Sequence, residues 1–101
     1  MTRTIRIVPA ILTDDVAMLK AMVKQVESFT DYVQIDIMDG LFVPSKSITA
    51  GDIAAIPLQI PWEAHLMVRE PQDYFDIFKK AGARRVIFHY EATTSPQSVI
   101  V

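Results

Sequence analysis

Short apolar segments rich in β-branched residues alternate with helical patterns along this chain, and the alternation predicts an α/β fold with parallel strands. Polar residues gather where the predicted strands end, which is the place where a (β/α)8 (TIM) barrel carries its chemistry. Such a barrel typically takes about 250 residues, whereas this chain has 101. We therefore expect only the first four βα units, a half-barrel that forms one domain over residues 1–101.

Composition excludes several classes of protein. With 50% hydrophobic and 22% charged residues the chain is typical of a globular domain. Its net charge of −2 gives no basic surface for nucleic acid. It has no cysteine for a disulfide or a thiolate site. No signal peptide and no run of roughly 20 apolar residues is present. We expect a cytoplasmic domain with no nucleic-acid or membrane partner.

The first βα unit is predicted from residues 5–12, which are apolar and β-branched and indicate a strand. Thr13 is suited to cap the helix that follows, with Asp14 and Asp15 in the first turn, where carboxylates favour the positive end of the helix dipole. The apolar stripe of this helix follows helical spacing and comprises Val16, Leu19, Met22, Val23 and Val26.

The second unit begins with a strand over residues 32–38. A loop over residues 39–47 follows, because Gly40 and Pro44 interrupt regular structure. A short helix is predicted over residues 51–56.

The third unit begins with a strand over residues 62–68. Pro71 suits the first turn of the next helix and Gly82 suits its C-terminal cap. A fourth strand is predicted over residues 84–90, and another helix begins at about residue 93.

Side chains alternate along a strand, so the pattern also predicts two different sheet faces. Val33, Ile35 and Ile37 share one face of the second strand, and the corresponding face of the other strands is also apolar. A sheet covered by helices on both sides would be apolar on both faces, so the polar face is better explained as the interior of a barrel. That face is predicted to carry Gln34, Asp36, Glu63, His65, Arg85 and His89.

Asp36 and His65 are predicted to lie side by side on neighbouring strands. A carboxylate and an imidazole in this arrangement suit Zn²⁺, Fe²⁺ or Mn²⁺, and Gln34 would add a weak carbonyl ligand. Each residue alone has an ordinary structural interpretation: Asp36 as an N-terminal cap or a partner of Arg85, and His65 as a hydrogen-bonded core histidine. Their joint placement favours a site.

Five segments together resemble the ribulose-phosphate 3-epimerase family. They are residues 8–12 (VPAIL), 33–40 (VQIDIMDG), 42–44 (FVP), 65–68 (HLMV) and 88–92 (FHYEA). The resemblance implies a (β/α)8 barrel that interconverts D-ribulose 5-phosphate and D-xylulose 5-phosphate. In that family two acids exchange protons at C3 through an enediolate, assisted by a divalent metal ion.

The resemblance also assigns expected roles to residues. Asp36 matches the acid that both exchanges a proton and binds the metal, and His65 matches a metal ligand at the substrate. Met38 and Met67 match methionines beside the reacting centre. Ala10 occupies a substrate-contacting position at which the family usually has serine.

Two further positions depart from the family pattern. Gln34 stands where a histidine ligand is usual, and Ser45 stands where asparagine is usual. No residue of the chain matches the family's second acid or its phosphate-binding loops. We therefore expect the chain alone to be inactive, and to need a second copy or a C-terminal half.

There are three alternatives to this hypothesis. The first is that the chain is a non-catalytic half-barrel that serves assembly. The second is that it belongs to an epimerase for another ketose phosphate, such as an allulose 6-phosphate. A decarboxylase of the orotidine-phosphate type is disfavoured, because Met38 occupies the position where that group has lysine.

Overall fold

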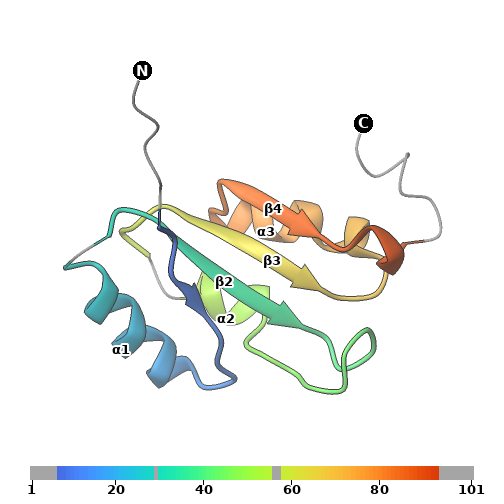
Figure 1. The fold of residues 1–101 in the computed structure, drawn as a ribbon, viewed down its shortest axis with the longest axis horizontal. Helices are drawn as coiled ribbons and strands as arrows, with labels where there is room; N and C mark the ends of the chain where they lie inside the picture. Colours follow the sequence, from blue (N-terminus) through green and yellow to red (C-terminus); the bar gives the residue numbers. More distant parts are fainter. Residues whose placement is uncertain (1–6, 29, 56–57, 94–101) are drawn as a thin grey trace.

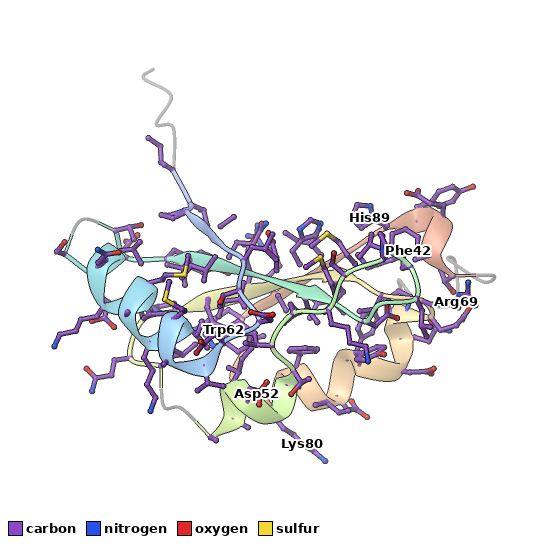
Figure 2. All side chains as sticks on the ribbon, turned by 90° about the horizontal axis from the view of Figure 1, so that it is seen from below. Phe42, Asp52, Trp62, Arg69, Lys80 and His89 are labelled. Atoms are coloured by element: carbon purple, nitrogen blue, oxygen red, sulfur yellow. The ribbon has the colours of Figure 1, made fainter. Side chains whose placement is uncertain are left out.

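The computed structural model describes residues 7–28, 30–55 and 58–93. In these residues four parallel strands form one sheet in the order β1-β2-β3-β4, as predicted (Figure 1). The three α-helices lie on one side of the sheet, which leaves the other side open (Figure 2). The elements are β1 (Ala10–Ile11), α1 (Val16–Val26), β2 (Val33–Met38), α2 (Ala50–Ala54), β3 (Trp62–Met67), η1 (Pro71–Tyr74), α3 (Phe75–Ala81), β4 (Arg85–Phe88) and η2 (Tyr90–Ala92).

Strand β1 is much shorter than the eight residues predicted. Only Ala10 and Ile11 pair with β2, opposite Gln34 and Ile35. Pro9 has no N–H to donate to the ladder, although its carbonyl accepts a hydrogen bond from the Gln34 N–H at 2.8 Å. Residues 5 and 6 of the predicted strand lie outside the described residues.

Helix α1 begins later than predicted, and its cap is Asp15, so the prediction that Thr13 caps it was wrong. The Asp15 carboxylate accepts hydrogen bonds from the N–H groups of Ala17 and Met18. Thr13 instead accepts a hydrogen bond from the Asp15 N–H at 3.1 Å. Both residues are favourable caps, and sequence spacing did not distinguish between them.

Helix α2 is capped by Thr49, whose side chain forms a reciprocal capping box with Asp52. It therefore begins at Ala50, one residue before the predicted start, and it ends at Ala54. Residue 56, the last residue of the predicted helix, lies outside the described residues.

The segment that begins at Pro71 starts as the 3-10 helix η1 and becomes α-helical only at Phe75. Gly82 ends α3 in a left-handed conformation (φ 105°), as predicted. Strand β4 stops at Phe88, so residues 89 and 90 are not part of it. Thr93 is extended, and the rest of the predicted final helix lies outside the described residues.

The covered face of the sheet forms the hydrophobic core. Ile35, Ala64 and Leu66 are fully buried beneath the helices, which contribute Leu19 and Phe78. On β2 the buried residues alternate strictly with half-buried ones. The predicted split between an apolar face and a polar face is therefore confirmed, and the polar face is the open one.

Among the described residues, no helix combines the length and the apolar character that crossing a membrane requires.

Candidate active site

Three polar side chains meet on the open face of the sheet. Asp36 on β2 lies directly opposite His65 on β3. The Asp36 Oδ1 is 3.1 Å from the His65 Nδ1, and it also accepts a hydrogen bond of 3.1 Å from the Gln34 Nε2. The parallel register thus brings together two residues that are 29 positions apart, and their predicted placement on one face is confirmed.

These three atoms form a small triangle, since the Gln34 Nε2 is also 3.4 Å from the His65 Nδ1. Metal–ligand bonds of about 2.0–2.1 Å place neighbouring ligand atoms roughly 3.0–3.4 Å apart. The side-chain amide of Gln34 can turn over and present its oxygen in place of its nitrogen. The triangle therefore has the dimensions of one face of a metal coordination sphere.

The donor set is nevertheless a weak one. Among the described residues no three histidine, aspartate or glutamate side chains converge on a point. The third donor at this site is the neutral amide of Gln34, and an amide oxygen is a poorer ligand for these metals than an imidazole.

A second histidine, His89, touches the triangle, and the sequence predicts only its place on this face. The His89 Nε2 is 3.0 Å from the His65 Nε2. The ring of His89 also packs against Phe42, with 5.5 Å between ring centroids, and Figure 2 shows both residues above the open face. His65 thus presents opposite ring nitrogens to Asp36 and to His89, so these three residues do not bind one ion together.

Two methionines lie beyond the triangle at the carboxyl-terminal ends of their strands. Met38 and Met67 are directly opposite one another, and both are half-buried. Near the start of the sheet, Ala10 is exposed and lies opposite Gln34. The candidate substrate residues therefore share the open face with the triangle, on both sides of it.

Asp39 follows β2 directly and holds the loop beside the site. Its Oδ1 accepts hydrogen bonds from the Leu41 and Phe42 N–H groups, and its Oδ2 accepts one from the Arg69 N–H at 2.9 Å. Burial raises the pKa of Asp39, but the backbone hydrogen bonds from Arg69, Leu41 and Phe42 outweigh it and hold the pKa below its usual value. Asp39 therefore places Phe42, and through Phe42 it supports His89.

The other end of the open face holds a separate charged pair. The Arg85 Nη1 is 3.8 Å from the Glu63 Oε1, and the Glu63 side chain is buried. Arg85 therefore pairs with Glu63, and the alternative in which it partners Asp36 is not what the structure shows.

Asp36 and His65 keep only 14% and 23% of their side chains exposed, yet they lie outside two cavities that the described residues form. A cavity of about 380 Å³ lies on the helical side of the sheet, with Ile48, Tyr74 and Phe78 in its wall. A second cavity of about 250 Å³ is lined by Ile60, Trp62 and other residues near the start of β3. Neither is lined by Gln34, Asp36 or His65.

Comparison with known proteins identifies close relatives. Residues 6–101 match the sequence model of the "Ribulose-phosphate 3 epimerase family". A ribulose-phosphate 3-epimerase of Bacillus subtilis is 41% identical over 91 residues, which cover 87% of this chain and 42% of the relative. One from Synechocystis is 38% identical, covering 95% of this chain and 43% of the relative. One from Chlamydia trachomatis is 35% identical, and the match covers 93% of this chain and 42% of the relative. The chain thus spans less than half the length of these relatives.

Proposed function

This chain belongs to the ribulose-phosphate 3-epimerase family, and on that premise we propose that it carries one half of an epimerase site. Asp36 is the acid of this half. It exchanges a proton at C3 of a ketose phosphate, and D-ribulose 5-phosphate is the substrate that the names of the relatives suggest. Residues 1–101 would then be the N-terminal half of a (β/α)8 barrel.

The observation that carries this proposal is the triangle formed by Gln34, Asp36 and His65. Removal of a proton next to a ketone places negative charge on the carbonyl oxygen, so the reaction needs a base and nearby positive charge. A divalent cation held by these three side chains would supply that positive charge. Zn²⁺, Fe²⁺ and Mn²⁺ all accept this mixture of nitrogen and oxygen ligands.

The two oxygens of Asp36 have different surroundings. Both of its hydrogen bonds, from Gln34 and from His65, go to Oδ1. In the described part of the chain Oδ2 accepts none. We assign the proton transfer to Oδ2, because an oxygen without a hydrogen-bond donor keeps its lone pairs available for the substrate proton.

Met38 and Met67 form an apolar boundary next to Asp36. Their thioether groups are polarizable and weakly hydrated, so they exclude water from the reacting carbon and slow wasteful exchange of its proton. His65 and Ala10 also face the substrate. The small Ala10 leaves space opposite Gln34, which favours a ketose phosphate of different shape as an alternative substrate.

Half a site does not complete an epimerisation. Asp36 serves one face of C3, and the opposite face needs a second acid, for which the described residues of this sheet offer no candidate beside the triangle. We propose that a C-terminal half-barrel, or a second copy of the chain, covers the open face and supplies it. The alternative of a non-catalytic assembly module uses the same open face without the chemistry.

A complementation assay tests this function. The 101-residue chain is assayed for epimerisation of D-ribulose 5-phosphate alone, and again with the remaining part of the Bacillus subtilis relative. We expect no turnover alone and measurable turnover in the mixture. Asp36→Asn is expected to lower the latter by about 10²–10⁴-fold, whereas Asp76→Asn, at an exposed position of α3 on the other side of the sheet, retains most of it. Equal activity of Asp36→Asn and the unchanged chain would contradict the assignment of Asp36.

A further inference from the structure

The contact between the two histidines assigns a role to His89. We propose that His89 is a positioning residue, which fixes the ring orientation of His65 so that its Nδ1 faces Asp36 and Gln34, and which can pair with either neutral tautomer of His65. This inference rests on the proposed function, because it concerns how a proposed metal ligand is held.

The proton count of the pair follows from the distances. The Asp36 carboxylate only accepts hydrogen bonds, so in the absence of metal the His65 Nδ1 at 3.1 Å carries the proton. The Nε2 of a neutral His65 is then an acceptor, and the His89 Nε2 at 3.0 Å must be the donor. Three of the four ring nitrogens therefore have one assigned role each, and the Nδ1 of a neutral His89 carries no proton in this state.

A cation that takes the Nδ1 of His65 requires that nitrogen to be free of its proton. The proton of a neutral His65 then sits on Nε2 and is donated to His89, whose Nε2 becomes the acceptor. The single proton of a neutral His89 must then lie on Nδ1 instead of Nε2, and the Glu91 Oε1 is 3.6 Å from that Nδ1. The pair carries two protons before and after, so His89 accommodates the change by exchanging one tautomer for the other.

The surroundings of His89 suit a residue that holds another in place. Its ring packs against Phe42 on one side and lies 5.1 Å from the His65 ring, centroid to centroid. Its side chain is 36% exposed and that of His65 is 23% exposed. A hydrogen bond to the second nitrogen of a metal-binding histidine fixes both its orientation and its tautomer, and loss of such a partner typically weakens metal affinity by about 10–100-fold.

Three variants separate this role from simple packing. His89→Phe keeps a ring against Phe42 and removes both nitrogens. His89→Gln restores a side chain that can either donate or accept a hydrogen bond. Glu91→Gln changes only the neighbour of the other nitrogen and serves as the matched control.

The experiment measures Zn²⁺ affinity by isothermal titration of the untagged 101-residue chain, with circular dichroism to compare folding. We expect His89→Phe to bind roughly tenfold or more weakly, His89→Gln to recover part of the loss, and Glu91→Gln to differ little from the unchanged chain. A loss for Glu91→Gln as large as for His89→Phe would overturn the proposal, because charge near Nδ1 would then be responsible. So would unchanged affinity in His89→Phe.

The ¹⁵N–¹H spectra of the histidine side chains give a readout that packing alone does not move. We expect His89 to change from the Nε2–H tautomer to the Nδ1–H tautomer when Zn²⁺ is added, and a His89 tautomer that stays the same would overturn the proposal.

If the unchanged chain binds no Zn²⁺, the proposed function loses its metal. The metal-free spectra then decide: the ¹⁵N resonance of His65 Nε2 must shift in His89→Phe and return toward its original position in His89→Gln. Loss of binding in Asp36→Asn but not in His89→Phe would overturn only this inference.

Discussion

The two faces of the sheet differ in burial and polarity, although their residues alternate along the same strands. On the covered face, Ile35 and Leu66 are fully buried and pack against helices. On the open face, their immediate neighbours Asp36 and His65 keep 14% and 23% of their side chains exposed and bond to each other. Residues of the hydrophobic core and residues of the proposed site are therefore immediate neighbours along each strand.

The physical reason for this separation is the two-residue period of a strand. The covered face lowers the free energy of the fold by removing apolar area from water. The open face buries less apolar area, because half-buried polar side chains such as Asp36 and His65 occupy it and form hydrogen bonds there. Substitutions on the two faces should therefore have different consequences.

The largest effect is expected from adjacent residues on opposite faces. Leu66→Ala removes a fully buried side chain and should lower the free energy of unfolding by about 2–5 kcal/mol. Met67 is the next residue of β3, and its half-buried side chain lies on the open face. Met67→Ala should lower the free energy of unfolding by about 1 kcal/mol or less. Urea unfolding followed by circular dichroism measures both. Equal losses would show that the open face is as much a part of the core as the covered one.

A change on the open face should instead alter metal binding. Gln34→His replaces the amide of the triangle by an imidazole, a better ligand for these metals. We expect about tenfold tighter Zn²⁺ binding, which is about 1.4 kcal/mol, with little change in unfolding. Isothermal titration measures it, with Gln34→Asn as the control, whose shorter amide does not reach the triangle. Affinity that is the same in all three chains would remove Gln34 from the site.

The smallest effect is expected at Asp39, the residue that directly follows β2. Its pKa is held below the usual value, so the unfolded chain takes up a proton at a higher pH than the folded one does. Its contribution to stability is therefore complete above the unfolded pKa of about 3.9 and is lost as the pH falls through the lower, folded pKa. Unfolding measured between about pH 6 and pH 3 should show this loss, and Asp39→Asn should lack that part of it. If Asp39→Asn lost as much stability between pH 6 and pH 3 as the unchanged chain, other carboxylates would be responsible for the pH dependence.

The sequence determined the order of elements, the parallel sheet and the assignment of residues to its two faces, because hydrophobic periodicity is local information. It also pointed to Asp36, His65 and Gln34 through their spacing and family motifs. It did not determine which of Thr13 and Asp15 caps α1, nor how far β1 extends, since these depend on small energy differences between neighbouring positions.

Only the tertiary structure decided which atoms meet. The register of β2 against β3 sets Asp36 opposite His65, and the exit of the chain after β4 brings His89 to the other nitrogen of the same ring. A one-residue slip of a strand would turn each of these side chains to the opposite face. Contacts across strands arise from the packing of distant segments, so the pairing of the two histidines could not be derived from the residues around either of them.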